Sequence, residues 1–400
     1  MPDQRQRRVL ALADDLSGAA ETAAGLLART TRNRVVLDAG RAAPREPGET
    51  TVVDLDCRHL PAAEATRRAR AALAAGGGRD AGGALVLAKV DSLLRGNLAA
   101  LARVLTEDGH PAVATTALPV AGRVVRDSTV HLRGVPLHET DAWRVEPTPP
   151  PRSLAAAFAP VPVAPVALRT VRTGHAALVA AFRAATAAGR MAVPDAESDA
   201  DLDAIAAAAL AADPATRLIG TGGIAGALGR HLGRPGAGAL AGPPPEGDRP
   251  LLVVVGSAEP TAAEQAARLA ADGATPLLLP LADPPPGRRP PSPALPMAGT
   301  TVLTIGRAAA PHPAPRALVA RLAAAVAGAL AAHAARGAPP ADLVLTGGET
   351  GRRVLDALGV RELEPVGQIH HGAVHQHPDG RSIVTRPGSY GGPDSLLRIV

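Results

Sequence analysis

Short apolar runs and Ala/Leu-rich stretches alternate along the chain, and a turn rich in Asp, Ser or Gly separates each pair. The first run, 9–13, leads into Asp14-Asp15-Leu16-Ser17-Gly18 and then a helical stretch over about 19–28. Strands that alternate with helices predict α/β domains with mostly parallel sheets flanked by helices. Because ligands bind beyond the carboxyl ends of such strands, the turns are the expected binding positions. The same arrangement follows four later apolar runs, 85–88, 217–220, 251–255 and 343–346.

A length of 400 residues favours two such domains. The segment 243–250 has the Pro-rich composition of a linker, and a new strand is predicted directly after it. We therefore predict an N-terminal domain over 1–242, a linker over 243–250 and a C-terminal domain over 251–400.

The composition narrows the class of protein. Four aromatic residues in 400 leave little surface on which bases could stack, which argues against a nucleic-acid partner. The net charge of +5 arises from acids and bases that are interspersed, and it suits small anionic ligands. A single Cys57 excludes an internal disulfide. No apolar run is read as reaching the ~18 residues of a membrane helix, so a cytoplasmic protein without a membrane partner is expected.

Lys89 is the one lysine in a chain with 42 Lys and Arg residues. Arginine is a planar fork that stays charged, whereas lysine is a compact point charge whose pKa responds to burial. The other cationic residues of the chain are all arginine, so a single lysine suggests a task that arginine cannot perform. The alternative is an ordinary surface position.

Asp14 and Asp15 follow the first predicted strand. Adjacent carboxylates at a strand end can take a proton from a hydroxyl, bind polyol hydroxyls or hold Mg²⁺. The alternative is a helix cap by Asp15 or Ser17. Successive side chains of a strand point to different sides, so we expect one of the two aspartates to face a ligand.

The run from Lys89 to Asn97 gathers two cations, a carboxylate, a hydroxyl and an amide around one strand end. Such a set suits an anionic, hydroxylated ligand. The alternative leaves Lys89 in solvent and makes Ser92 a helix cap. A further strand over 51–55 precedes Arg58, which could bind a carboxylate with both arms. The candidate residues are Arg58, Lys89, Asp91, Ser92, Arg95 and Asn97.

The second half of the chain carries Gly-rich turns after its strands. Gly256-Ser257 and Gly347-Gly348-Glu349-Thr350 each precede a predicted helix, and Gly391 belongs to a closing Gly-rich segment. Paired glycines let backbone N–H groups approach phosphates closely. The chain has no Walker loop and no dinucleotide fingerprint. A histidine cluster over 370–377 is interpreted as a solvated hairpin loop around 378–380, and no metal ligand is assigned.

In this order, the motifs resemble the four-carbon acid sugar kinase family. Asp14 to Ala19 is similar to its opening D-D-L-T-G-A, and Lys89 to Asn97 to its K-I-D-S-T-L-R-G-N. Leu118-Pro119 with Gly122-Arg123, the segment 134–140, Gly347 to Thr350 and Thr385 to Gly391 follow in family order. The resemblance spans nearly the whole chain.

The resemblance implies an N-terminal sugar-acid domain, a C-terminal nucleotide domain and an active site between them. It implies transfer of the ATP γ-phosphate, with Mg²⁺, to the terminal hydroxyl of a four-carbon sugar acid. Asp14, Asp15, Arg58, Lys89, Asp91 and Ser92 would touch the acid, with Asp15, Asp14 and Lys89 as catalytic candidates. Ser257, Gly347, Gly348, Glu349, Thr350 and Gly391 would touch ATP.

Three positions depart from the family pattern: Leu93 replaces Thr, Glu349 replaces Asp and Arg386 replaces Lys. These departures keep two alternatives open, a kinase for a related hydroxy acid and a sugar-acid-binding regulator without turnover. The sequence also leaves a homodimer open.

Overall fold

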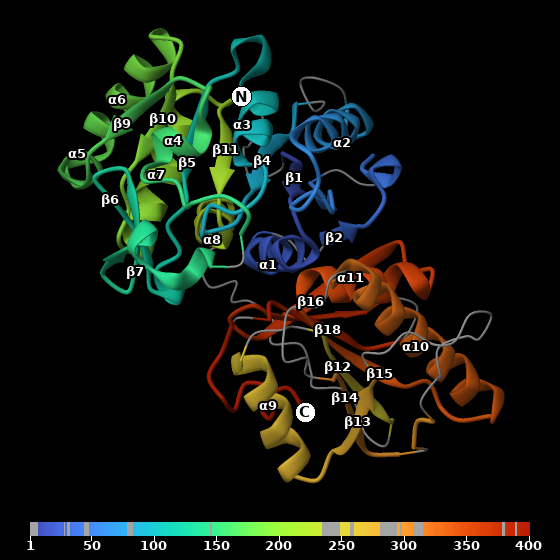
Figure 1. Ribbon diagram of the computed structural model, residues 1–400. Coiled ribbons are helices and arrows are strands. Elements are labelled where there is room, and N and C mark those ends of the chain that lie inside the picture. The colour runs from blue at the N-terminus through green and yellow to red at the C-terminus, as the bar shows by residue number, and fades with distance from the viewer. Residues whose placement is uncertain are drawn as a thin grey trace. The chain divides into compact units, whose positions relative to one another are not determined.

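The computed structural model divides the chain into two compact units, Met1–Ala239 and Leu240–Val400. Figure 1 colours the first from blue to green and the second from yellow to red. The predicted domain boundary and most of the predicted linker fall in 234–248, outside the described residues, so they stay predictions. The described residues are 7–27, 29, 33–43, 48–77, 83–144, 146–233, 249–256, 260–280, 294–296, 298–306, 315–377, 381–388 and 390–400.

A parallel sheet forms the centre of the first unit, with strand order β2-β3-β1-β4-β11-β5-β10-β9. Its central strands are buried along their whole length, as expected for strands covered on both faces. The strands are β1 (Val9–Ala13), β2 (Asn33–Val36), β3 (Thr50–Asp54), β4 (Leu85–Lys89), β5 (Ala112–Thr115), β9 (Val163–Val166), β10 (Met191–Pro194) and β11 (Arg217–Gly220).

Ala-rich helices cover this sheet (Figure 1). Helices α1 and α8 pack with backbones in contact, since a Cβ on Gly229 would lie 2.1 Å from the Gly25 carbonyl oxygen. The helix of the first turn begins at Leu16, earlier than the predicted 19. The helices are α1 (Leu16–Leu26), α2 (Ala62–Ala75), α3 (Leu98–Thr106), α4 (Leu154–Phe158), α5 (Leu168–Thr173), α6 (His175–Ala187), α7 (Asp199–Ala212) and α8 (Gly222–Leu232).

A small antiparallel sheet is inserted after β5. It consists of β6 (Arg123–Arg126), β7 (Thr129–Leu132) and β8 (Val135–Pro136). Short 3₁₀ helices, η2 (Ala39–Arg41), η4 (Glu107–Gly109), η5 (Pro119–Ala121), η6 (Leu137–Glu139) and η7 (Asp141–Trp143), connect elements of this unit.

The second unit has its own sheet, ordered β13-β14-β12-β15-β18-β17-β16. The pairs from β13 to β18 are parallel, and β17 pairs antiparallel with both β18 and β16. The predicted α/β class with mostly parallel sheets is therefore confirmed. The strands are β12 (Leu251–Val255), β13 (Thr275–Leu279), β14 (Thr300–Ile305), β15 (Asp342–Thr346), β16 (Glu362–His370), β17 (Ala373–His377) and β18 (Ile383–Arg386); the helices are α9 (Pro260–Ala271), α10 (Pro315–Ala335) and α11 (Gly348–Ala357).

Helix α10 corrects one sequence-based statement. Of the helices in the described part of the chain, α10 is the one that is long and apolar enough to cross a membrane, judged by length and composition alone. The segment concerned is Arg316–Ala335. The apolar run was overlooked because alanine carries most of it. Half of the most apolar window is buried, and α10 packs on α11, which is also the behaviour of a core helix.

Candidate functional site

The turn between β1 and α1 presents two carboxylates. Asp14 is 1% exposed, whereas Asp15 keeps a partly exposed side chain. Asp15 is the N-cap of α1, and its Oδ1 accepts a hydrogen bond of 2.8 Å from the Gly18 amide. The predicted cap is therefore present, and the same carboxylate still reaches a second partner through Oδ2.

That partner is Arg58, from the loop after β3. Its Nε and Nη2 donate to Asp14 Oδ2 and Oδ1 over 2.7 and 2.8 Å, and its Nη1 donates to Asp15 Oδ2 over 2.8 Å. One guanidinium therefore bonds both carboxylates, although Asp14 is buried and Asp15 keeps exposed surface. That only one of the two aspartates faces a ligand stays a prediction.

Electrostatics in this cluster are set by burial and by close pairs. Burial raises the pKa of Asp14, and the Arg58 guanidinium opposes that shift. Burial alone would lower the pKa of Arg58, but Asp14, Asp15 and Asp91 hold it well above its usual range. Arg58 therefore stays charged between the two carboxylates.

The strand end of β4 contributes Lys89 and Asp91. Lys89 is 5% exposed, so the surface alternative for the lone lysine is wrong. Its ammonium lies 3.2 Å from Glu21 Oε2 on α1. Asp91 accepts from Arg95 Nε over 2.7 Å, and its Oδ1 lies 4.0 Å from Arg58 Nη2. Burial would raise the pKa of Asp91, but the surrounding arginines hold it well below its usual range.

Two predicted residues hold parts of the site together. Asn97 donates to the carbonyl oxygens of Cys57 and Leu60 over 2.8 and 2.9 Å, which fixes the loop that carries Arg58. Ser92 Oγ accepts a hydrogen bond from Arg123 Nη1. Direct ligand contacts of Asn97 and Ser92 remain predictions.

Sequence reasoning missed Glu21 and Arg123 as members of this cluster. Glu21 follows Asp15 and Gly18 at intervals of three, which places all three near one face of α1. Arg123 belongs to the Gly122-Arg123 pair that resembles the family, and this resemblance was the one signal in the sequence that could have pointed to it.

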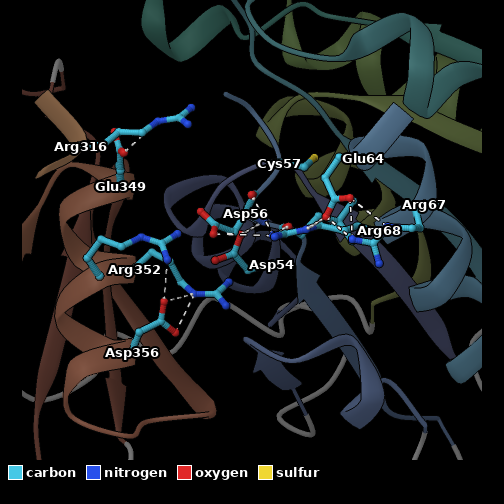
Figure 2. A network of polar contacts seen from close by, with 12 residues as sticks. Asp54, Asp56, Cys57, Glu64, Arg67, Arg68, Arg316, Glu349, Arg352 and Asp356 are labelled. Carbon is cyan, nitrogen blue, oxygen red and sulfur yellow. Dashed lines mark hydrogen bonds and ion pairs between the residues drawn. The ribbon is translucent and has the colours of Figure 1, made fainter. Parts of the chain in front are cut away.

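A further arginine, Arg68, contacts the loop that follows β3, next to Glu64 and Arg67 of α2 (Figure 2). Arg68 on α2 donates through Nη1 to the carbonyl oxygens of Leu55 and Asp56, and through Nε to Glu64. Asp56 has a left-handed backbone, with φ of 46°, and its amide donates to Asp54 Oδ1. These contacts fix the turn from β3 to Arg58.

In the second unit, the backbone at the turn after β15 lies close to its neighbours, as expected for a Gly-rich turn. Gly347 has φ of 97°, and α11 begins at Gly348. A Cβ on Gly256, at the end of the neighbouring strand β12, would lie 2.2 Å from Thr350 Oγ1. Only glycine fits there without a shift. Ser257 lies outside the described residues, so its predicted role has no structural account.

Glu349 and Arg386, two of the departures from the family pattern, differ in their surroundings. Glu349 lies on the first turn of α11, with Oε1 3.9 Å from Arg316 Nε (Figure 2). Arg386 is 1% exposed, donates to Gln265 Oε1 over 2.7 Å and also bonds the Tyr390 carbonyl. Arg386 therefore ties the closing Gly-rich turn to α9. Burial lowers its pKa to about 10.

The histidine cluster differs from the predicted solvated loop. His370 and His375 belong to the antiparallel strands β16 and β17, which turn at 371–372, and His375 is 1% exposed. The residues 378–380, where the loop was expected, lie outside the described part. Across the described ranges, no group of three His, Cys, Asp or Glu side chains could hold a metal ion.

Comparisons with known proteins assign a family to each half of the chain. Residues 9–228 match a family described as a sugar-binding N-terminal domain, and residues 296–396 match a nucleotide-binding C-terminal domain. A D-threonate kinase of Cupriavidus necator is 34% identical over 264 residues, 65% of this chain. The chain belongs to the four-carbon acid sugar kinase family. A D-erythronate kinase of Heliobacterium modesticaldum is 33% identical over 210 residues, 50% of this chain.

These alignments cover 63% and 47% of the two relatives' own lengths.

Two solved structures resemble the fold over nearly the whole chain. A Salmonella typhimurium LT2 protein, for which a tRNA synthase activity has been suggested, superposes with a TM-score of 0.73, 98% coverage of both chains and 21% identity. A Haemophilus influenzae protein gives a TM-score of 0.68, also 98% coverage of both chains and 20% identity. At these identities the likeness concerns the fold alone.

Proposed function

We propose that this protein is an ATP-dependent kinase that phosphorylates the terminal hydroxyl of a four-carbon sugar acid, of the threonate, erythronate or 3-oxo-tetronate type, and that it acts in the cytoplasm. The observation that carries the proposal is the cluster of Asp14, Asp15 and Arg58 at adjoining strand ends, with Lys89 and Asp91 at the next strand. This cluster combines carboxylates that can bind the hydroxyls of a sugar acid with cations that can bind its carboxylate.

Asp15 is the carboxylate that would orient the acceptor hydroxyl and take its proton. Both oxygens of Asp14 are bonded to Arg58 and the side chain is fully buried, whereas Asp15 retains exposed surface. Asp14 would then hold Arg58 in place and keep it charged. Phosphoryl transfer depends mainly on positioning and on charge stabilisation, so an oriented hydroxyl is the central requirement.

The substrate carboxylate would be bound by Arg58 and Lys89. A guanidinium has five N–H donors, and Asp14 and Asp15 engage three of those on Arg58. One N–H on each terminal nitrogen is left for the substrate. Arg95, whose side chain is 22% exposed, would add a third positive charge at the same edge while it holds Asp91. Asp91, Ser92 and Asn97 would complete the pocket wall.

ATP fits the turns of the second unit. Gly256 and Gly347 bring backbone close to the N-terminus of α11, where amide groups and the helix dipole favour phosphate. Gly348, Glu349 and Thr350 form the first turn of that helix, and Ser257 and Gly391 are the further nucleotide candidates. Mg²⁺ in such sites is held largely by the phosphates with one or two carboxylates, and Glu349 is the carboxylate on this turn.

A substrate panel tests the proposal. ATP consumption is measured with Mg²⁺ and D-threonate, L-threonate, D-erythronate, 3-oxo-tetronate and longer sugar acids, in parallel with thermal shift. Turnover with a four-carbon acid is expected. Turnover confined to another hydroxy acid supports the related kinase. A thermal shift on four-carbon acids without ATP consumption supports the regulator and overturns the proposed kinase.

A further inference from the structure

The Lys89 ammonium is held in a slot between two helices. It lies 3.2 Å from Glu21 Oε2, and both side chains are 6% exposed. A Cβ on Gly18 would lie 3.0 Å from Lys89 Nζ and 2.8 Å from Asp15 Oδ1. Lys89 therefore runs over Gly18, with its ammonium near the carboxylates of Glu21 and Asp15.

The other wall of the slot is the start of α8. A Cβ on Gly222 would lie 2.3 Å from Glu21 Cδ and 2.4 Å from Glu21 Oε1. Four residues further along both helices, a Cβ on Gly25 would lie 3.1 Å from the Gly226 amide nitrogen. Glycine at position 222 therefore makes room for the carboxylate of Glu21 where α1 and α8 pack together.

We infer that Glu21 is the positioning residue of Lys89: it fixes the ammonium at the end of β4 and keeps it charged for the substrate acid group. A buried ammonium requires a counter-charge, since removal of one partner from a buried pair leaves an uncompensated charge. Asp14 also interacts with Lys89, but both of its carboxylate oxygens are bonded to Arg58. The carboxylate of Glu21 lies within 3.2 Å of the ammonium.

The kinetic consequence rests on the proposed kinase function, whereas the ion pair can be tested without turnover. Because the chain has one lysine, protein grown with ¹³Cε-lysine gives a single side-chain signal, that of Lys89. Its titration with pH is recorded in the wild type, Glu21→Gln and Glu21→Asp. In Glu21→Gln the midpoint is expected to fall by at least about one unit, and Glu21→Asp should restore part of it.

The kinetic arm uses the same variants with a four-carbon acid. Glu21→Gln should lower kcat/KM for the acid at least ~10-fold, with the greater loss at high pH, and leave the KM for ATP unchanged. Glu21→Asp should recover part of the activity. A folded Glu21→Gln variant whose lysine signal titrates as in the wild type overturns the inference. So does a moved titration with unchanged kinetics, because the pair would then be structural only.

A second pair of variants covers the case in which Glu21→Gln does not fold. Gly222→Ala keeps Glu21 but displaces its carboxylate, and it should reproduce the shifted lysine signal. Gly226→Ala on the same helix is the matched control, because its Cβ would meet only Arg230 Nη1 at 3.3 Å. If the lysine signal of Gly222→Ala titrates as in Gly226→Ala, the claim that Gly222 makes room for the Glu21–Lys89 pair is contradicted. If no acid is turned over by the wild type, the NMR arm still decides.

Discussion

Arg58 and Asp14 form a two-point ion pair, with Nε and Nη2 bonded to the two carboxylate oxygens over 2.7 and 2.8 Å. Through Nη1 the same guanidinium binds Asp15. A single arginine thus holds two adjacent acids at one strand end. This arrangement separates a buried supporting carboxylate from one that can meet a substrate, and the first predictions follow from that separation.

Asp15→Asn should lower kcat by about 100-fold or more, since the loss of an oriented base costs 10²–10⁴ in many enzymes. The amide keeps the size of the side chain and can still cap α1, so the fold should persist. Steady-state kinetics and circular dichroism check this expectation. Asp203→Asn, on an exposed side chain of α7, is the control. Wild-type kcat in both Asp15→Asn and Asp14→Asn would transfer the role to Asp91.

Asp14→Asn should act chiefly on stability. It removes the partner of a buried guanidinium, a change that typically costs about 3–5 kcal/mol. The free energy of unfolding in urea measures this effect, and Asp15→Asn provides the comparison. A smaller loss for Asp14→Asn than for Asp15→Asn would reverse the assignment of the two carboxylates.

Lys89→Arg should lose at least ~10-fold in kcat/KM, about 1.4 kcal/mol of transition-state stabilisation. The slot over Gly18 has no room for a planar fork, and the ammonium is already within 3.2 Å of Glu21. The control is Arg190→Lys at an exposed position. Near-wild-type kinetics in Lys89→Arg would mean that the site requires charge alone.

Gly348→Val should raise the KM for ATP and leave the KM for the sugar acid unchanged. The substitution adds a branched side chain at the first residue of α11, where phosphate must approach the amides. Ala357→Val, at the exposed far end of the same helix, is the matched control. Equal ATP kinetics in the two folded variants would remove α11 from the nucleotide site.

Stability at acid pH should depend on Asp91. The arginines around it hold its pKa below the ordinary 3.8, so the folded state binds fewer protons than the unfolded state. The resulting stabilisation is complete well above pH 3.8 and is lost as the pH falls through the lowered pKa. Tm measured from pH 7 to pH 2 should therefore fall less steeply in Asp91→Asn than in the wild type. Parallel curves would contradict this linkage.

The periodic pattern of the sequence was enough for the fold class and for most strand ends. Predicted runs such as 217–220 and 251–255 coincide with β11 and β12, because buried parallel strands are continuous apolar segments. Side-chain partners were harder to predict. The pairing of Lys89 with Glu21 joins positions 68 residues apart, and only the packing of α1 on the sheet brings them together.

Local rules also failed where tertiary structure overrides them. His375 looked solvated by composition but is buried between the strands of a hairpin sheet. Arg386, at a position where the family pattern has Lys, is buried and bonded to Gln265. In both cases the polar side chain has a protein partner that the linear sequence does not reveal.

The most direct measurement of the central claim is ³¹P NMR of the product formed from ATP and a four-carbon sugar acid. Transfer to the terminal hydroxyl predicts a phosphomonoester signal split into a triplet by the two hydrogens of a CH₂ group, and its absence with Asp15→Asn. A doublet would place the phosphate on an internal hydroxyl. No new phosphoester, with a four-carbon acid demonstrably bound, would contradict the account.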